Sequence, residues 1–226
     1  MRACEFCGGH DVRPLNHYGP RCLRGDYRIT TGKADNVWCT ACGLAWNQSM
    51  MNDGELAEFY AGYTKKTASE DEDDLLFGDS AADVQTLTDS QAQFLAAHVS
   101  RTSGEALDIG CGKGAFLRAF HRLRPGWRCA GVEPSTEEAA LARRETPFEI
   151  HEGMFGDVPL GRGRFDLVTI MHVLEHVSRP SAVVQQIRDI LAPGGLLFVE
   201  VPNVLDANMF YDLLLVEHRA SANIFT

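Results

Sequence analysis

An alternation that begins at Gly104 constrains the fold of this chain more than any other feature. Short apolar runs, rich in Val, Ile, Leu and Phe, are separated by runs with helical periodicity. This pattern is typical of βαβ units, in which parallel strands form one sheet and helices cover its faces. We therefore predict an α/β protein with a doubly wound sheet. The predicted strands are Glu105–Ile109, Trp127–Glu133, Phe148–His151, Phe165–Met171 and Leu196–Val201.

A glycine-rich turn follows the first predicted strand. It contains Gly110, Gly112 and Gly114, and Asp108 precedes it. Glycines let the backbone pass close to a ligand, and the helix that follows offers unpaired N–H groups. Glu133 ends the second strand 25 residues after Asp108, where a carboxylate can accept both hydroxyls of a ribose. Together these residues predict a nucleoside-binding cleft at the carboxyl ends of the strands.

Two classes of ligand fit this cleft. The spacing Gly110-x-Gly112-x-x-Ala115 also satisfies the dinucleotide fingerprint, which leaves an NAD-dependent oxidoreductase as an alternative. Asp108 favours a different ligand. A carboxylate at this place would repel a pyrophosphate but would attract the ammonium or sulfonium of S-adenosylmethionine.

Helices are predicted between the strands. Ser135 and Glu138 have the spacing of a capping box that opens a helix through Arg144, and the glycines after Pro193 end a later one. The segment Ala82–Ser100 is interpreted as a helix that either flanks the cofactor or only packs. Apolar residues at helical spacing are Phe116, Ala119, Phe120 and Leu123 in one helix, and Val183, Val184, Ile187, Ile190 and Leu191 in another.

Two cysteine pairs provide a second strong signal. Cys4-x-x-Cys7 and Cys39-x-x-Cys42 are separated by 31 residues, and a glycine follows each pair. Four thiolates in a tetrahedron suit a structural Zn²⁺ ion, and a small segment with few apolar residues needs such a staple. A catalytic zinc is excluded because four cysteines leave no open coordination position. Redox cysteines or two disulfides are the alternative.

A histidine-containing segment follows the fourth strand. His172 and His176 are four residues apart and would share one face of a helix. Either can act as a general base near neutral pH, or can pack on the cofactor without taking part in the chemistry. The letters H-x-x-E-H, which end at His176, also match a zinc-protease motif. We reject that interpretation because the segment follows a buried strand.

Four segments resemble the successive motifs of class I S-adenosylmethionine-dependent methyltransferases: Leu107–Gly114, Gly131–Ser135, Phe165–Val168 and Leu191–Leu196. The resemblance covers about residues 104–203 and implies a Rossmann-like sheet of seven mostly parallel strands. It implies that Asp108 and Gly110 lie near the methionine moiety of the cofactor, Glu133 at the ribose, and Met154 and Phe155 beside the adenine. Further cofactor contacts are expected from Gly112, Gly114 and His172. Asp157 is the nearest acid for the adenine amino group.

The zinc module ahead of such a domain is similar to the arrangement in sugar C-methyltransferases and related enzymes of polysaccharide or natural-product pathways. That narrower resemblance implies a small-molecule acceptor, such as a nucleotide-linked sugar. It also implies catalytic roles for Tyr63 (or Tyr60), His176, Glu217 and His218.

The chain divides into a zinc-binding module over residues 1–47, a linker with a flanking helix over 48–103, and the methyltransferase domain over 104–226. The 25 residues that follow the fifth strand are fewer than two further strands require. The prediction is therefore that the chain is truncated, or that a partner or missing segment covers the open sheet edge.

Composition sets the remaining limits. The 226 residues carry a net charge of −10, which disfavours a nucleic-acid-binding surface. No apolar stretch is long enough to span a bilayer, and residues 1–13 lack a secretory signal. We expect a cytoplasmic S-adenosylmethionine-dependent methyltransferase with a structural zinc site. A zinc-ribbon adaptor whose methyltransferase-like domain does not catalyse is a further alternative.

Overall fold

A computed structural model describes residues 3–4, 6–17, 21–23, 29–31, 35–47, 51–61 and 86–201. The described chain falls into two compact units. One holds the described parts of residues 1–53 together with Glu175–Ser181 and Val201, and the other holds those of 54–174 and Ala182–Glu200. No helix in the described ranges has the length and apolar character needed to cross a membrane.

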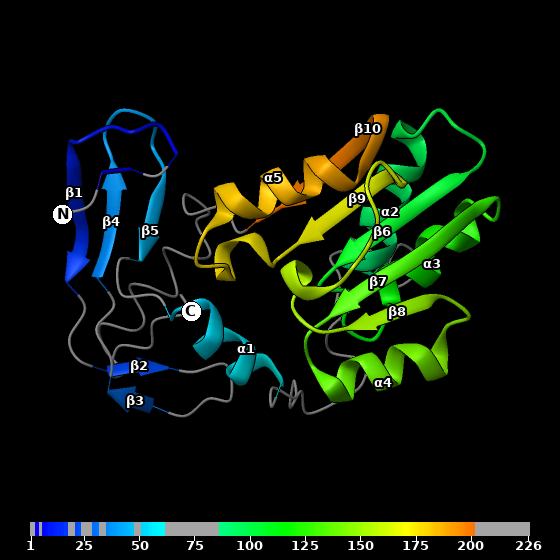
Figure 1. Cartoon of the computed structure of the whole chain (residues 1–226), viewed down its shortest axis with the longest axis horizontal. Coiled ribbons are helices and arrows are strands. Elements are labelled where there is room, and N and C mark those ends of the chain that lie inside the picture. Colours follow the sequence, from blue (N-terminus) through cyan, green and yellow to red (C-terminus); the bar gives the residue numbers. More distant parts are fainter. Residues whose placement is uncertain are drawn as a thin grey trace, which may run out of the picture. The chain divides into compact units, whose positions relative to one another are not determined.

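The larger unit is built on one parallel sheet of five strands, as predicted (Figure 1). The strands run in the order β10-β9-β6-β7-β8, so the chain first moves outward from β6 in one direction and later returns to its other side. Ligands bind at such a switch point in open α/β sheets. The bounds are β6 Gly104–Ile109, β7 Trp127–Glu133, β8 Glu149–Glu152, β9 Phe165–Met171 and β10 Leu191–Glu200.

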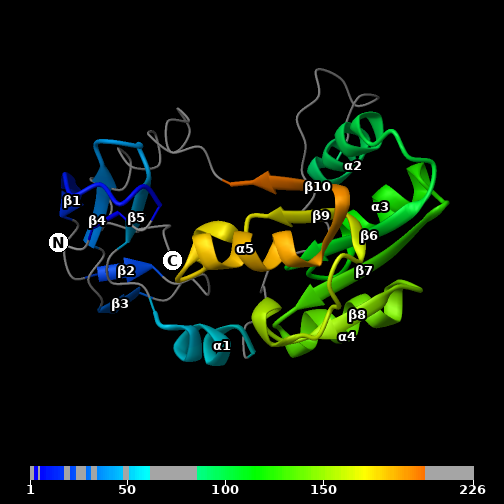
Figure 2. The ribbon, with the colours of Figure 1, turned by 45° about the horizontal axis from the view of Figure 1, so that its top comes forward.

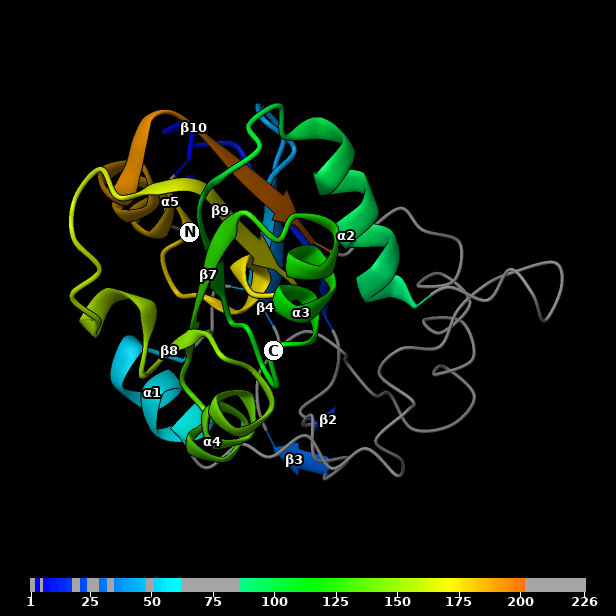
Figure 3. The same cartoon turned by 90° about the vertical axis from the view of Figure 1, so that its right-hand side faces the viewer.

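Helices cover both faces of this sheet (Figures 2 and 3). Helices α2 (Leu87–His98), α3 (Ala115–Leu123) and α4 (Thr136–Glu145) contribute apolar side chains to one core cluster. Helix α5 (Pro180–Ile190) contributes to a second cluster on the opposite face. Strand β9 supplies both clusters, because successive side chains of a strand point to opposite faces. Its central residues are at most 1% exposed, which confirms the prediction of a strand buried on both sides.

The helix signals hold with three corrections, one of which is that Val184, expected on the apolar face of α5, is 39% exposed. Ser135 Oγ accepts the backbone N–H of Glu138 at 3.3 Å, as a capping box requires. Leu123, expected on the buried face of α3, is 46% exposed because it lies at the last helical residue. Helix α5 ends at Ile190 rather than at the following proline and glycines, since the backbone of Leu191 already pairs with Phe165 of β9.

The smaller unit contains a three-stranded antiparallel sheet of β1 (Val12–His17), β4 (Asp35–Cys39) and β5 (Ala45–Asn47). A second antiparallel pair joins β2 (Arg21–Leu23) to β3 (Ile29–Thr31).

Helix α1 (Asp53–Ala61) and the short 3₁₀ helices η2 (Phe155–Asp157) and η3 (Leu174–His176) complete the described elements.

Several predictions about the chain's end fall on residues 202–226, which lie outside the described ranges. These are the truncation and the covering of the open sheet edge. The predicted domain boundaries near residues 47 and 103 also stay predictions.

Candidate functional site

The glycine turn between β6 and α3 has a backbone that few other residues can adopt. Gly110, Gly112 and Gly114 have φ angles of +76°, +50° and +76°, a region that side chains disfavour. A Cβ atom on Gly110 would also lie 2.3 Å from Cγ2 of Val173, whereas one on Gly112 would meet no atom closer than 3.8 Å. Gly110 is therefore required by packing as well as by φ, whereas a Cβ on Gly112 would make only an ordinary contact with Glu138.

Asp108 lies at the end of β6, immediately beneath this turn. Its side chain is 3% exposed, and Oδ1 accepts the hydroxyl of Thr169 on β9 at 2.7 Å. Burial raises the pKa of this carboxyl to about 7, the Thr169 hydrogen bond opposes that change, and the charge of Glu133 adds to it. The fold therefore holds a carboxyl group whose charge is poorly compensated.

Glu133, at the end of β7, ties the turn to its strand. Its Oε2 accepts the backbone N–H of Gly112 at 2.9 Å, and its Oε1 accepts that of Ser135 at 2.8 Å. Burial raises the pKa of Glu133 despite these two hydrogen bonds, and the charge of Glu138 contributes in the same direction. A carboxylate can accept about four hydrogen bonds, so Glu133 keeps capacity for hydroxyls of a ligand.

Glu138 was missed as a site residue because its position was explained by the capping box alone. It is 7% exposed, and one carboxylate oxygen lies 3.8 Å from the position that a Cβ on Gly112 would take. Asp108, Glu133 and Glu138 all raise the pKa of the Cys111 thiol, after burial as the main cause. Three carboxyl groups thus surround one glycine turn.

Acidic residues at the opposite end of the same sheet, where the strands begin, are paired with an arginine. Glu105, at the start of β6, pairs with Arg164 at 2.7 Å, and Arg164 also pairs with Glu149 of β8 at 2.8 Å. These hydrogen bonds lower the pKa of both glutamates. Asp108 and Glu133 have no lysine or arginine partner among the described residues. The described carboxyl ends of β6 and β7 therefore lack the positive charge that balances Glu105, whereas Glu152 at the end of β8 pairs with Arg143 at 3.1 Å.

His172 directly follows β9 and has a φ angle of +52°, which is unusual for a residue other than glycine. Its backbone N–H donates to the carbonyl of Glu200 at 2.9 Å, and its Nε2 lies 2.9 Å from Oε1 of the same residue. His176 lies in η3 and belongs to the smaller unit. Its Nε2 atom is 3.9 Å from Oε1 of Glu175.

The residues expected beside the adenine lie around η2. Met154 precedes this short helix, Phe155 begins it, and Asp157 is exposed. Phe155 packs against the cluster beneath α5 and lines a cavity of about 230 Å³ with Gln186 of that helix. The contacts of Met154, Phe155 and Asp157 with the adenine stay predictions. Tyr63, Glu217 and His218 lie outside the described ranges.

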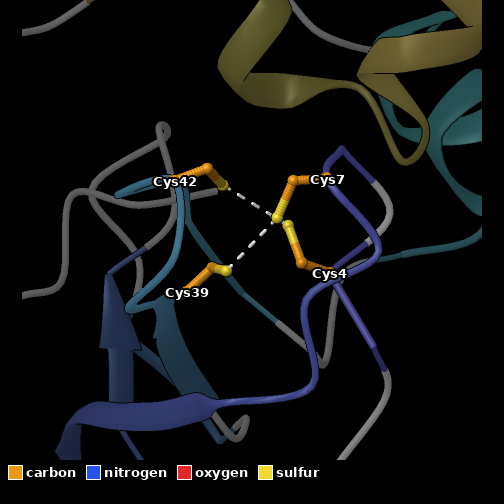
Figure 4. Close-up of side chains that lie close together, drawn as sticks. All are labelled: Cys4, Cys7, Cys39 and Cys42. Atoms are coloured by element: carbon orange, nitrogen blue, oxygen red, sulfur yellow. Dashed lines mark hydrogen bonds between the residues drawn. The ribbon is translucent and has the colours of Figure 1, made fainter.

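The four predicted cysteines come together from two turns (Figure 4). In the first, the N–H of Gly8 donates to the carbonyl of Cys4 at 2.8 Å, and in the second, that of Gly43 donates to Cys39 at 2.8 Å. Both glycines have a left-handed backbone, with φ of +72° and +79°. The two C-x-x-C-G segments therefore form the same turn twice, and each turn presents two sulfur atoms.

The spacing of the sulfurs fits a tetrahedral ion. All four lie within 4.8 Å of one another, with Cys4 and Cys42 3.7 Å apart and Cys7 and Cys39 3.6 Å apart. Bonds of about 2.3 Å in a tetrahedron around zinc would separate sulfurs by about 3.8 Å, whereas a disulfide needs about 2.05 Å. A hydrogen bond from the Cys42 backbone lowers the pKa of the Cys39 thiol to about 7, whereas the neighbouring thiols raise the pKa of Cys7. The donor set and its geometry thus fit Zn²⁺.

The two cysteines of the larger unit are of another kind. Cys111 and Cys129 are both buried, and Gly131 makes room for Cys111, since a Cβ on that glycine would lie 2.4 Å from the Cys111 sulfur. Burial raises the pKa of Cys129 to about 12. Both therefore serve as small core residues.

A family profile described as "Methyltransferase domain" matches residues 81–223. The ubiquinone biosynthesis O-methyltransferase of Shewanella pealeana is 32% identical over 117 residues, which are 47% of this chain and 49% of that protein. An uncharacterized 37.1 kDa protein in transposon TN4556 of Streptomyces fradiae is 30% identical over 136 residues, 58% of this chain and 39% of that protein. The chain thus spans half or less of the length of these curated relatives.

Among solved structures, a coclaurine N-methyltransferase bound to N-methylheliamine and SAH has the same fold. It aligns with a TM-score of 0.51 and 16% identity over 67% of this chain and 46% of that one.

Proposed function

The chain belongs to the methyltransferase family whose domain profile matches residues 81–223, and from that premise we propose that it transfers a methyl group from S-adenosylmethionine to a small molecule. One observation carries the proposal. Asp108 and Glu133 are buried beneath the glycine turn without a basic partner among the described residues. A site with this charge suits a cation and repels a pyrophosphate, so it favours S-adenosylmethionine over NAD.

The residues of the cleft fit this cofactor. The carboxylate of Asp108 would attract the positively charged amino-acid end of S-adenosylmethionine, and Glu133 would accept its ribose hydroxyls. Gly112 suits a close approach of the cofactor to the backbone, because it has no side chain and the nearest atom to a Cβ there would be a Glu138 carboxylate oxygen at 3.8 Å. When bound, S-adenosylmethionine supplies a methyl group that is already activated by a positively charged sulfur. The chain then has to hold the acceptor in line with that methyl group and exclude water.

We propose a hydroxyl or carbon acid on a small molecule as the acceptor. The similar proteins named ubiquinone biosynthesis O-methyltransferases support a hydroxyl. The resemblance to sugar C-methyltransferases supports a nucleotide-linked sugar, or a polysaccharide or natural-product precursor. Either acceptor must lose a proton, for which we propose His172, with His176, Tyr63, Glu217 and His218 as further candidates from the resemblance.

We propose that Cys4, Cys7, Cys39 and Cys42 hold a structural Zn²⁺ ion. The ion would staple a unit whose buried apolar side chains are few, chiefly Val12 and Val37 beside the cysteines. The six cysteines whose side chains the structure describes form no disulfide, which suits a reducing compartment. A cytoplasmic location is proposed on that basis.

Calorimetric titration of the full chain with S-adenosylmethionine and with NAD tests the cofactor. We expect binding of the first and little of the second, and preference for NAD would overturn the proposal. Turnover is tested by formation of S-adenosylhomocysteine with phenols, catechols and nucleotide-linked deoxysugars. Binding of S-adenosylmethionine without turnover of any acceptor would favour the non-catalytic adaptor.

A further inference from the structure

Thr169 places a hydroxyl group in the middle of the apolar strand β9. It is 1% exposed, and its partner in register is Asp108 of β6, the neighbouring strand in Figure 1. Side chains of residues opposite each other on neighbouring strands lie on the same face of the sheet. A buried hydroxyl needs a hydrogen-bond partner, and the carboxyl of Asp108 is placed to provide one.

The further neighbours of Asp108 in the sheet are apolar or weakly polar. On its other side the partner in register is Gly131 of β7, whose missing side chain leaves room for the sulfur of Cys111. Beyond Thr169, the next partner is Phe198 of β10, which packs against the core cluster of this face. A hydrogen bond between Asp108 and Thr169 therefore forms where the local dielectric is low and where such bonds are stronger than in water.

The Thr169 hydroxyl has two acceptors within reach. Its Oγ1 lies 2.7 Å from Oδ1 of Asp108 and 3.3 Å from the backbone carbonyl oxygen of Leu107. A hydroxyl has one hydrogen and two lone pairs, so it donates to one of these oxygens at a time and can also accept a hydrogen bond. The two contacts are therefore compatible with two states of the Asp108 carboxyl.

Each protonation state of Asp108 has its own direction of hydrogen bonding. When Asp108 is ionised, the Thr169 hydroxyl donates to Oδ1, since a carboxylate can only accept. When Oδ1 carries a proton, the carboxyl donates to Oγ1 of Thr169, and the Thr169 hydroxyl points to the carbonyl of Leu107. Rotation about one C–O bond of Thr169 is enough to change between them. Asp108 and Thr169 thus stay hydrogen-bonded to each other in both states, which avoids the cost of an unpaired buried group.

We propose that Thr169 is a positioning residue whose hydroxyl turns between Leu107 and Asp108 and so allows Asp108 to lose its proton as the cationic cofactor binds. The inference rests on the proposed methyltransferase function. The O–H bond of the Asp108 carboxyl breaks, its proton passes to water, and the electron pair stays on the carboxylate as the charge that attracts the cofactor. The Thr169 hydroxyl then turns from the carbonyl of Leu107 to Oδ1 of Asp108.

The other titratable groups near Asp108 do not favour its ionised form. They are carboxyls and thiols: Glu133 and Cys129 of β7, Cys111 of the glycine turn and Glu138 of α4. Burial raises the pKa of both thiols, so they stay neutral. Burial and the charge of Glu133 also raise the pKa of Asp108, whereas the Thr169 hydrogen bond lowers it. Among these groups, the Thr169 hydroxyl is therefore the one that stabilises the carboxylate.

The first arm of the test needs no cofactor. In the full chain labelled with ¹³C at the aspartate carboxyls, the chemical shift follows the ionisation of Asp108, and the Asp108→Asn spectrum assigns its signal. Thr169→Val removes the hydroxyl at nearly constant volume and should raise the pH midpoint of Asp108 by about one to two pH units. Thr169→Ser keeps the hydroxyl and should leave the midpoint nearly unchanged. Thr146→Val is the matched control, since its buried hydroxyl donates to the carbonyl of Ala142 at 2.8 Å.

The second arm measures affinity for S-adenosylmethionine by calorimetry at pH 6 and pH 9. Because the cofactor binds the ionised form of Asp108, the affinity should follow the ionised fraction. Thr169→Val should bind about 10- to 100-fold more weakly than wild type at pH 6, and within about twofold of it at pH 9. Titration of the cofactor's own amino group affects both proteins equally. Thr169→Ser and Thr146→Val should resemble the wild type at both pH values.

A midpoint of Asp108 that does not rise in Thr169→Val would overturn the proposal. An equal loss of affinity at pH 6 and pH 9 would also refute it, because a merely structural role does not depend on the ionisation of Asp108. If Thr169→Val does not fold, Thr169→Cys offers a weaker donor of similar size and should still raise the midpoint, and no rise there would be equally decisive. If the wild type binds no S-adenosylmethionine, the proposed function fails, while the carboxyl titration still decides whether Thr169 acts on Asp108.

Discussion

Asp108→Asn is expected to make this protein more stable at pH 8 while weakening its binding of S-adenosylmethionine. Burial raises the pKa of Asp108 from 3.8 to about 7 in the folded chain. Because the folded pKa lies above the unfolded one, the fold favours the protonated form. The stability present below pH 3.8 is therefore lost progressively as the pH rises to about 7, and it stays lost above that pH.

The size of the effect follows from the same two values. A difference of one pH unit in pKa corresponds to about 1.4 kcal/mol, so the ionised Asp108 destabilises the fold by about 4 kcal/mol at pH 8. At pH 5 the same calculation yields roughly 2 kcal/mol. Asparagine keeps an acceptor for the Thr169 hydroxyl and carries no charge. The gain in unfolding free energy for Asp108→Asn over wild type should thus grow by roughly 2 to 3 kcal/mol between pH 5 and pH 8.

Urea unfolding followed by circular dichroism at the two pH values measures this difference. Asp89→Asn is the control: Asp89 forms an exposed pair with Arg122 at 2.7 Å, and its loss should change stability by less than about 0.5 kcal/mol at either pH. A gain for Asp108→Asn that is the same at pH 5 and pH 8 would refute the reasoning, because it would show that ionisation of Asp108 is not what destabilises the fold.

The same substitution should have the opposite effect on cofactor binding, which it weakens. A cation near Asp108 favours the carboxylate, so binding below about pH 7 must release a proton. Affinity for S-adenosylmethionine should therefore rise with pH up to about 7 and then level off, by at most tenfold per pH unit. The asparagine variant should bind more weakly and without this pH dependence. Calorimetry at pH 6, 7 and 8 tests this, and a variant that binds as tightly as wild type at pH 8 would contradict it.

Three further predictions concern the turn and the metal. Gly110→Ala should destabilise the protein more than Gly112→Ala, by at least about 1 kcal/mol in urea unfolding, because only the first places a Cβ 2.3 Å from Val173; equal losses would contradict the packing argument. Glu133→Gln should weaken S-adenosylmethionine binding about tenfold or more in calorimetry, since it replaces an acceptor oxygen with a donor. Metal analysis should find about one zinc per chain, less than half of that in Cys39→Ser, and wild-type content in Cys129→Ala.

Much of the fold followed from the amino-acid pattern. The strands Trp127–Glu133 and Phe165–Met171 have the predicted bounds, because a short apolar run between turn residues has few other ways to be buried. The helix cap at Ser135 is local and was equally readable. Leu123 was wrongly predicted to be buried. The spacing of apolar residues shows which face of a helix is apolar, but the burial of its last residue depends on which other parts of the chain pack against that end.

Sequence alone identified the glycines of the turn, the acids near the ends of β6 and β7, and the four cysteines that the structure brings together. Their chemistry is local, so spacing along the chain was enough. Only the tertiary structure decided the charge balance and the partners. Arg164 neutralises Glu105 from 59 residues away, while Asp108 is buried without a basic partner in the described chain, and Gln91 reaches Glu200 from a distant helix. The physical reason is that burial and hydrogen bonding depend on distances in space, which only packing of the sheet and its helices defines.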